Sequence, residues 1–255
     1  MKLYIFYFSP TGGTKHVSDI FCSVWDCEKA FVNLGDLDSD ISLAGEDACV
    51  IAVPSFGGRV PQFLIPKFRH IRGNGAKAFL IAVYGNRAYE DTLAELNDTA
   101  ESAGLICCGA GAVVARHSIL PKYGAGRPDD SDIQELKHFS GQCKDYFHTE
   151  TNGSGLTTLP GNRPYRPYAT LPITPSAGKA CTGCGLCAKK CPVNAIPSDN
   201  LRKCDKNACI SCMQCVSLCP SHVRRVNAAI LKAADLKLKK ACSERKSNEF
   251  FLPRT

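Results

Sequence analysis

The 255-residue sequence lacks any apolar run approaching the roughly 18 residues that span a bilayer, so it predicts no membrane span. The apolar segment 1–8 is not followed by the small-residue cleavage site of a secretory signal peptide. Hydrophobic residues make up 44% of the chain and charged residues 22%, which is ordinary for a globular protein and argues against long disordered segments. We therefore expect a soluble protein of the cytoplasm.

Several catalytic motifs are also missing. The sequence has no G-x-x-x-x-G-K-[ST] loop for ATP and no G-x-G-x-x-G fingerprint for a nicotinamide cofactor, since Gly109 and Gly111 lie in a predicted strand without a third glycine. The 6 histidines include no i, i+4 metal-binding pair, and Ser154 lacks the G-x-S-x-G frame of a hydrolase. The sequence therefore identifies no catalytic residue.

Cysteine, by contrast, is abundant, with 16 residues. Disulfides are typical of exported proteins, whereas thiols in a reducing compartment persist as metal ligands. Eight of the cysteines form two copies of the pattern C-x-x-C-x-x-C-x-x-x-C-P, at 181–192 and 209–220. A zinc site would favour two C-x-x-C pairs rather than two runs of four. The spacing therefore predicts two 4Fe–4S clusters.

The fourth cysteine of each run is separated from the first three. In bacterial two-cluster proteins this cysteine ligates the other cluster. The rule predicts a first thiol set and a second thiol set: Cys181, Cys184, Cys187 and Cys219 in the first, and Cys209, Cys212, Cys215 and Cys191 in the second. The remaining cysteines have no ligand spacing, and among them only Cys204 is expected near a cluster.

Residues 1–150 alternate β-rich runs with helical patterns, which predicts a doubly wound α/β domain with a parallel sheet. The predicted strands are 2–8, 30–34, 48–54, 76–84 and 105–115, and the predicted helices are 14–23, 61–71, 89–103 and 130–147. Residues 151–178 hold five prolines and four glycines and predict an extended linker. Residues 179–226 are too few for a large core, so cluster assembly must stabilise this second domain. Residues 227–255 predict a basic C-terminal helix and tail.

Three loops at strand ends suit a bound ligand. Ser9-Pro10-Thr11-Gly12-Gly13-Thr14 follows the first predicted strand, and its hydroxyls and glycine N–H groups at a helix N-terminus form a phosphate cradle. Residues 54–61 and 84–91 follow the third and fourth strands. Because the carboxyl ends of parallel strands share one sheet edge, we expect the three loops to lie together.

The S-x-T-G-x-T loop resembles the phosphate loop of flavodoxins, and residues 1–226 together resemble fusion proteins that join an N-terminal flavodoxin domain to a bacterial two-cluster ferredoxin domain. The resemblance implies a flavodoxin-like five-stranded parallel sheet in the order 2-1-3-4-5, a small α+β ferredoxin-type domain, FMN and two 4Fe–4S clusters. It implies phosphate contacts from Ser9, Thr11, Gly12, Gly13 and Thr14. It implies ring contacts from Ser55, Phe56, Gly57, Gly58, Arg59, Tyr84, Gly85, Asn86, Arg87 and Tyr89.

Two features of the expected ring loops bear on the flavin. Gly85 can turn its peptide toward the ring, because glycine tolerates either orientation. Arg59 and Arg87 depart from the acidic surroundings of the short-chain flavodoxins, and a cation near the ring would favour the reduced anion and raise its potential. The formal charge of +7 does not predict nucleic-acid binding, because two clusters and a flavin phosphate would offset most of it.

The predicted function is low-potential electron transfer between the two clusters and FMN, as in the metabolism of an anaerobe, with separate redox proteins as partners. The alternative is a ferredoxin-fed, FMN-dependent reductase of a small organic acceptor such as a quinone, an enone or a nitro compound. A cluster-based sensor is the least supported hypothesis, since no DNA-binding motif is present. The sequence leaves open the electron donor and acceptor, the direction of flow, the potentials and the oligomeric state.

Overall fold

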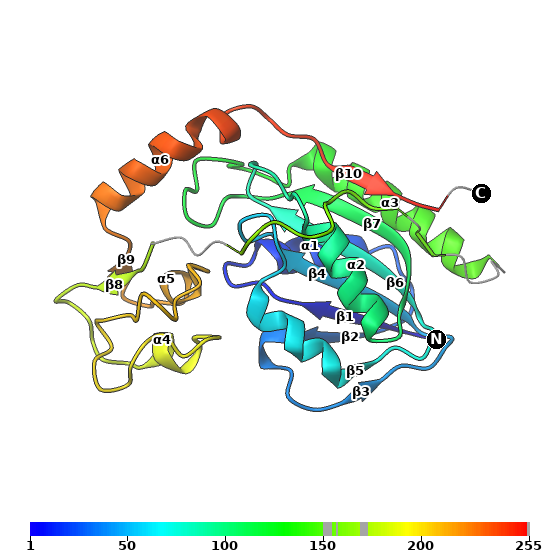
Figure 1. The fold of residues 1–255 in the computed structure, drawn as a ribbon, viewed down its shortest axis with the longest axis horizontal. Coiled ribbons are helices and arrows are strands. Elements are labelled where there is room, and N and C mark those ends of the chain that lie inside the picture. Colours follow the sequence, from blue (N-terminus) through cyan, green and yellow to red (C-terminus); the bar gives the residue numbers. More distant parts are fainter. Residues whose placement is uncertain (150–154, 157, 169–172, 254–255) are drawn as a thin grey trace.

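The computed structural model describes residues 1–149, 155–156, 158–168 and 173–253 (Figure 1). An N-terminal domain is built on a sheet with helices on both faces, and a smaller domain lies beyond one end of that sheet. No helix among the described residues is both long and apolar enough to cross a membrane.

A mostly parallel, six-stranded sheet forms the centre of the N-terminal domain. Its strands are β1 (Lys2–Tyr7), β2 (Glu28–Asn33), β4 (Ala48–Pro54), β6 (Lys77–Tyr84), β7 (Ile106–Val114) and β10 (Glu249–Phe251). The five parallel strands lie in the order β2-β1-β4-β6-β7, which is the predicted order 2-1-3-4-5. The predicted doubly wound, flavodoxin-like fold is therefore confirmed.

The sixth strand is a correction to the five-stranded prediction. The sequence predicts only a helix and a tail for residues 227–255. Helix α6 (Ala228–Cys242) does form, but the chain then returns to the N-terminal domain, where β10 pairs antiparallel with β7. A three-residue strand is too short to carry an alternating pattern, and its pairing partner lies far away in the sequence.

Buried strands follow from residues that are apolar on both faces. Strand β4 is buried from Ala48 to Val53, and its side chains alternate between two hydrophobic cores. Cys49 and Ile51 belong to one core, while Val50 and Ala52 belong to the other. This double burial is typical of parallel sheets covered by helices on both sides.

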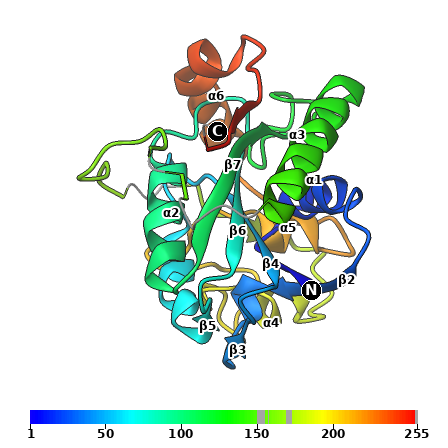
Figure 2. The same cartoon turned by 90° about the vertical axis from the view of Figure 1, so that its right-hand side faces the viewer.

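The helices divide between the two faces of the sheet (Figure 2). Helices α1 (Gly13–Cys22) and α3 (Asp130–His148) cover one face, and α2 (Thr92–Ser102) and the 3-10 helix η2 (Gln62–His70) cover the other. The segment 61–71 predicts an α-helix, but Pro66 lies inside it. Proline removes one backbone donor and disrupts α-helical pairing, which accounts for the tighter 3-10 form.

The remaining elements of this domain are short. The 3-10 helix η1 (Leu34–Asp36) is followed by β3 (Ile41–Ser42), which pairs in parallel with β5 (Ile71–Arg72) in a separate two-stranded sheet. Residues 158–168 of the Pro- and Gly-rich segment lie against the N-terminal domain, whereas residues 173–178 belong to the smaller domain. Within residues 158–168, the Arg163 guanidinium pairs with Asp98 of α2, and the Gln62 N–H donates to the Tyr168 hydroxyl.

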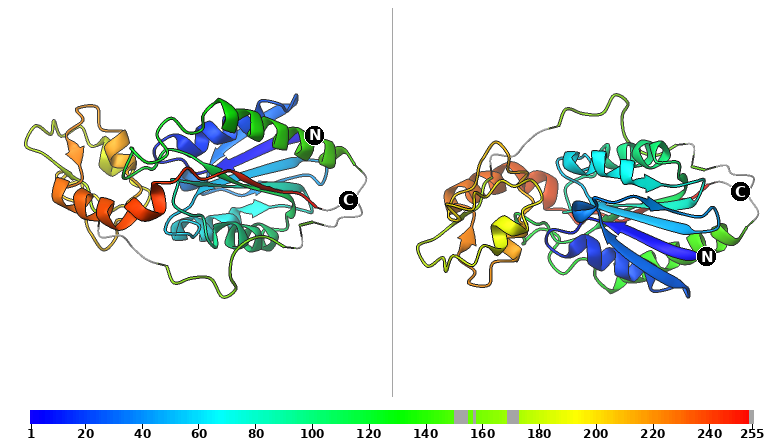
Figure 3. Two further views of the ribbon diagram at one scale, coloured as in Figure 1. Left: turned by 90° about the horizontal axis from the view of Figure 1, so that it is seen from above. Right: turned by 90° about the horizontal axis from the view of Figure 1, so that it is seen from below.

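The smaller domain has little regular structure. Strand β8 (Ser176–Ala177) pairs antiparallel with β9 (Arg224–Arg225), and each cysteine run contains one single-turn helix, α4 (Leu186–Lys189) in the first and α5 (Gln214–Ser217) in the second. We call residues 173–226 the cluster domain. Helix α6 extends from the cluster domain toward the N-terminal domain, and the tail then runs along the sheet (Figure 3).

Candidate functional site

A narrow cleft lies at the carboxyl edge of the parallel strands, on the side of the sheet that faces the cluster domain (Figure 1). Its volume is about 80 Å³. Residues at the ends of β1, β4, β6 and β7 line it: Pro10, Thr11, Gly13, Thr14, Pro54, Ser55, Phe56, Val83, Tyr84, Gly85, Ala115, Arg116, His117 and Ser118. The structure thus brings together parts of all three predicted loops.

The phosphate loop has the geometry of an anion cradle. Gly12 adopts a left-handed conformation, with φ at 91°, and helix α1 begins directly after it. The Lys15 N–H donates to Ser9 Oγ at 2.8 Å, which leaves the Ser9 hydroxyl proton available to an anion. The N–H groups of Gly13 and Thr14 belong to the first turn of the helix and have no hydrogen-bond acceptor among the described residues. These free donors fit a phosphate group.

The loop after β4 is a tight hairpin turn. Phe56 and Arg59 exchange backbone hydrogen bonds, and Gly57 and Gly58 between them have φ values of 63° and 84°. Two successive positive φ values are characteristic of a type I′ turn and favour glycine at both positions. A Cβ on Gly58 would lie 1.9 Å from the Glu90 carboxylate, so glycine is required there for space as well.

The Arg59 side chain does not line the cleft. Its guanidinium binds the Glu95 carboxylate through two hydrogen bonds, Nε–Oε2 at 2.8 Å and Nη2–Oε1 at 2.6 Å. It also lies over the rings of Tyr165 and Tyr168. The hydrogen bonds that Arg59 donates to Glu95 raise the pKa of Arg59 above its usual value. The expected effect of this cation on a flavin ring is therefore not supported, because its charge is neutralised outside the cleft.

Three more residues of the expected ring loop bind the C-terminal tail instead. Asn86 Nδ2 donates to the carbonyls of Cys242 and Glu244 at 2.7 and 2.8 Å, and Asn86 Oδ1 accepts from a tail N–H. The Tyr89 hydroxyl donates to the carboxylate of Glu249, and the Tyr84 hydroxyl donates to a tail carbonyl. Asn86 and Tyr89 therefore lie away from the cleft lining, and Tyr84 reaches both the cleft and the tail.

Arg87 also stays outside the cleft lining, where it pairs with Glu90. Gly85 does line the cleft and lies directly against His117. His117 Nδ1 accepts from the N–H groups of Ile119 and Leu120, so the ring is a neutral acceptor. Burial, together with a smaller effect of the nearby Arg87, lowers the pKa of His117 to about 4.

The lining residues Ala115 to Ser118 are not among the predicted site residues, although the long segment that begins at His117 and Ser118 is expected to wall a pocket or to face the second domain. They follow β7, where the segment 117–128 is long for a connection between a strand and a helix. The length of this loop is the one signal that points to them. No local motif distinguishes His117 from the other five histidines in the sequence.

In the cluster domain, one small hollow is lined by the whole first thiol set. Its lining includes four cysteines: Cys181, Cys184, Cys187 and Cys219. In the second thiol set, burial raises the pKa of the Cys212 thiol to about 12, and three neighbouring thiols raise it as well: Cys215, Cys191 and Cys209. The fourth cysteine of each run thus lies near cysteines of the other run.

Within the described residues, no three His, Cys, Asp or Glu side chains converge on a point where a single ion would sit. Thiolates around a cubane each bind a different iron and need not converge. Cys204 lies beside the second set, and its hydrogen bond to Cys209 lowers the pKa of the Cys209 thiol. This is the position expected for Cys204.

A buried arginine lies between the two thiol sets. Arg224 is 2% exposed, and its donors reach three carbonyls and two thiols: those of Leu201, Lys203 and Pro175, and of Cys187 and Cys215. Its Nε–H has no acceptor within the described part of the chain. A buried cation with an unpaired donor beside both sets suits an anionic iron–sulfur cluster.

The loop after β7 joins the cleft to the cluster domain. Ile119, Leu120 and Tyr123 belong to the same buried apolar cluster as Met213, which follows Cys212 of the second thiol set. The Lys122 ammonium and the Tyr123 hydroxyl both bind Asp235 of α6, at 2.7 and 2.6 Å. The two domains are therefore packed together along this loop.

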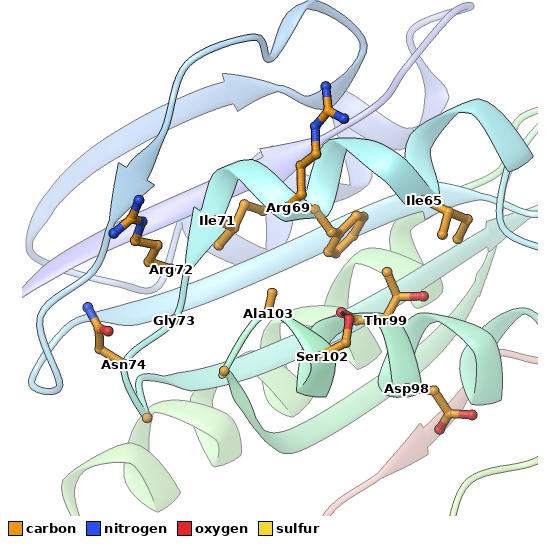
Figure 4. Close-up of a pocket in the computed structure, with 13 residues that line it drawn as sticks. Ile65, Arg69, Ile71, Arg72, Gly73, Asn74, Asp98, Thr99, Ser102 and Ala103 are labelled. Carbon is orange, nitrogen blue, oxygen red and sulfur yellow. Dashed lines mark hydrogen bonds between the residues drawn. The ribbon is translucent and has the colours of Figure 1, made fainter.

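A larger hollow lies elsewhere in the described part of the chain. It has a volume of about 810 Å³ and lies between η2 and α2, at the amino ends of β6 and β7 (Figure 4). Its lining includes Gly73, Asn74 and Thr99, and none of the predicted site residues. Asp98 at its edge is paired with Arg163. The predicted loops and thiols therefore point to the smaller cleft and not to this hollow.

Comparison with known proteins agrees with this division of the chain. Residues 180–223 match the family model of the 4Fe-4S dicluster domain. Solved structures similar to this chain include a flavodoxin from the domain Archaea, with 13% identity, 58% of this chain and 100% of that chain covered, and a TM-score of 0.42. Oxidised Flavodoxin 1 from Bacillus cereus has 16% identity, 59% and 100% coverage and a TM-score of 0.42.

Rubredoxin oxygen:oxidoreductase from Desulfovibrio gigas has 12% identity, 58% and 37% coverage and a TM-score of 0.42. No curated protein matches the sequence. The strand order of the N-terminal domain and the family match of the cluster domain lead to the same conclusion. The chain joins a flavodoxin-like α/β domain and a 4Fe–4S dicluster domain in one polypeptide.

Proposed function

We propose that the protein transfers low-potential electrons between two 4Fe–4S clusters in the cluster domain and FMN in the cleft. The observation that carries this proposal is the position of the cleft. It lies at the sheet edge that faces the cluster domain, and the loop from His117 to Tyr123 lines the cleft at one end and packs against Met213 at the other.

The phosphate loop supports FMN as the ligand. The free N–H groups of Gly13 and Thr14 and the hydroxyl of Ser9 offer neutral donors to a dianion at the start of α1. Ser55 and Phe56 line the cleft beyond the phosphate loop and are proposed to contact the ring end of the cofactor. When bound, FMN exchanges one or two electrons and so connects one-electron clusters with two-electron chemistry.

The two thiol sets support two clusters. Each set contains four cysteines from both runs, so every cluster ties the two halves of the domain together. Thiolate-ligated clusters persist in reducing compartments, which supports a cytoplasmic location. Arg224 would hold the anionic charge of both clusters at once.

The test uses protein whose clusters are reconstituted without oxygen and from which flavin has been removed. FMN and riboflavin are titrated separately and followed by flavin fluorescence. We expect FMN to bind at least tenfold more tightly, because only FMN carries the phosphate that the cradle binds. Equal affinities would overturn the FMN assignment.

A second measurement tests the route between the cofactors. Reduced ferredoxin is mixed with holoprotein, and the loss of cluster absorption is compared with the loss of flavin absorption. We expect flavin reduction to follow cluster reduction, and to be lost in Cys187→Ser but retained in Cys27→Ser, a control outside both cysteine runs. Flavin reduction at the normal rate in Cys187→Ser would contradict the proposed route.

A further inference from the structure

The basic residues of the cluster domain differ from those of the N-terminal domain in their pairing. Residues 173–226 contain eight Lys and Arg but only two carboxylates, Asp199 and Asp205. None of the eight lies within ion-pair distance of a carboxylate in the described part of the chain. In the N-terminal domain, cations are commonly paired, as Arg59 is with Glu95. Seven of the eight, all except the buried Arg224, are exposed, so the surface of the cluster domain is positive even though two bound clusters would offset part of its net charge.

Four of these cations flank the first thiol set: Lys179, Lys189, Lys190 and Arg202. All four are exposed, and Arg202 Nη2 donates to the Lys179 carbonyl at 3.2 Å, which places these two residues side by side. Cys184 of the first thiol set is itself exposed. We call these four residues the basic face. It surrounds the thiol set that is open to solvent.

The second thiol set lies on the inner side of the domain. Cys212 is 8% exposed and Met213 is 4% exposed. Met213 shares its apolar cluster with Leu120 and Tyr123 of the N-terminal domain, and no residue of the first cysteine run belongs to that cluster. The first thiol set is thus accessible to a partner, and the second is adjacent to the loop that leads to the cleft.

We propose that an acidic redox protein docks on the basic face and that its electrons enter through the cluster of the first thiol set. The partner loses one electron and is oxidised, and the accepting cluster gains that electron and is reduced, so no bond forms or breaks. The second thiol set then lies between the entry point and the cleft. This inference rests on the proposed function, and it adds the entry point and the chemistry of the partner.

Charge complementarity is the argument for an acidic partner. Opposite charges on two docking surfaces raise association rates by about 10- to 1,000-fold at low ionic strength. Salt weakens this attraction, because the Debye length shortens to about 8 Å at physiological ionic strength. A protein with surface carboxylates around its own redox centre therefore fits the basic face.

The experiment uses oxygen-free holoprotein and two reductants of opposite charge. One is an acidic 2Fe–2S ferredoxin, reduced beforehand, and the other is the reduced methyl viologen cation. The test variant is Lys189→Glu/Lys190→Glu on the basic face. The control is Lys237→Glu/Lys240→Glu on α6, which changes the net charge by the same amount at exposed positions. Cluster reduction is followed by rapid mixing at several ionic strengths.

We expect the test variant to lower the reduction rate by ferredoxin about tenfold at low salt, and the control to change it less than twofold. The difference should vanish at high salt, and the rate with methyl viologen should not fall. Equal effects of the two variants would overturn the docking face. The docking face would also be overturned if the test variant left the reduction rate by ferredoxin unchanged while the basic face bound a DNA duplex in a salt-dependent way.

The same traces separate this inference from the proposed function. The rate of cluster reduction tests the docking face, whereas the later loss of flavin absorption tests electron transfer to the cleft. If the clusters are reduced in the predicted charge-dependent way and the flavin stays oxidised, the proposed function fails and the docking face stands. If the clusters are reduced by ferredoxin at the same rate in all variants and the flavin is then reduced, the docking face fails and the proposed function stands.

Discussion

The ring of His117 packs so closely on Gly85 that a Cβ at position 85 would lie 2.8 Å from its Cγ and Cδ2 atoms. This contact sets one wall of the cleft. The sequence analysis assigns Gly85 a role in turning its peptide toward the flavin, whereas the structure shows a second requirement, which is space for an imidazole ring.

Gly85→Ala is therefore expected to destabilise the protein and widen the cleft. We expect a loss of about 1–3 kcal/mol in the free energy of unfolding, typical of overpacking at a buried site, and weaker FMN binding. Chemical denaturation and FMN titration measure the two effects. Gly141→Ala in α3 is the control, since a Cβ there meets no atom within 4 Å and should stabilise the helix by about 0.5–1 kcal/mol. Similar behaviour of the two variants would contradict the His117 contact.

The neutral state of His117 predicts a pH dependence of stability. Burial lowers the pKa of His117 to about 4, whereas the unfolded chain has the ordinary value of 6.5. Between these values the unfolded chain binds the proton and the folded protein does not, so stability falls as the pH drops from 6.5 toward 4, by at most about 1.4 kcal/mol per pH unit.

Below pH 4 both states bind the proton, and this contribution becomes constant. The measurement is the unfolding free energy of wild type and His117→Asn from pH 4 to 8. The difference between the two curves isolates His117, because the other titrating groups are common to both proteins. A difference that does not change with pH across this window would contradict the lowered pKa, because His117 would then titrate alike in the folded protein and the unfolded chain.

The Glu95 carboxylate forms an ion pair with the largely buried guanidinium of Arg59. Glu95→Gln leaves that cation without a counter-charge, and we expect a loss of about 3 kcal/mol in unfolding free energy, since breaking one partner of a buried pair is costly. FMN affinity should not change, because Arg59 lies outside the cleft lining. Glu28→Gln breaks the exposed pair with Lys2 and should cost less than about 1 kcal/mol. A large change in FMN affinity in Glu95→Gln would place Arg59 at the ring after all.

Arg224 should be required for cluster assembly. Its guanidinium touches Cys187 and Cys215, one from each thiol set. A lysine ammonium is a single point charge, so it cannot reach both thiols and also bind the surrounding carbonyls. We expect Arg224→Lys to retain at most half of the wild-type iron and sulfide after reconstitution. The exposed neighbour provides the control, and Arg225→Lys should retain the full content. Normal iron content in Arg224→Lys would show that positive charge alone is sufficient.

Asn86 should control how firmly α6 is held. Asn86→Ala removes three hydrogen bonds to the end of α6 and the segment after it, and we expect faster amide hydrogen exchange in α6 and β10. Asn74→Ala is the matched control, because Asn74 also has a positive φ and also bonds a distant carbonyl, that of Leu43. Its exchange should increase near β5 and not in α6. Equal exchange of α6 in both variants would contradict the anchoring role of Asn86.

Local patterns were sufficient to predict the parallel sheet and its strand order. Continuous apolar runs identify strands covered on both faces, as β4 is, and the hydroxyl and glycine pattern after β1 identifies the phosphate loop. The repeated cysteine spacing predicts the two sets of thiols, because the chemistry of iron–sulfur ligation depends on short sequence distances. These features are all encoded within a few neighbouring residues.

Pairings between distant residues could not be predicted in the same way. Asn86 and Tyr89 belong to a loop that resembles a flavin-binding loop, but their partners Cys242 and Glu249 come from the far end of the chain. Arg59 likewise binds Glu95, and no local pattern in the sequence predicts this pairing. A single sequence shows which residues are available for a site, and the tertiary fold decides which of them are already engaged elsewhere.

The position of β10 has a consequence for the biosynthesis of the protein. Strand β7 forms an edge of the parallel sheet until β10 covers it, and β10 lies beyond the cluster domain in the chain. During translation the N-terminal domain therefore leaves the ribosome with the β7 edge of its sheet uncovered, and this edge stays uncovered while both cysteine runs are synthesised. The α/β domain is completed last, after all the cluster ligands have emerged.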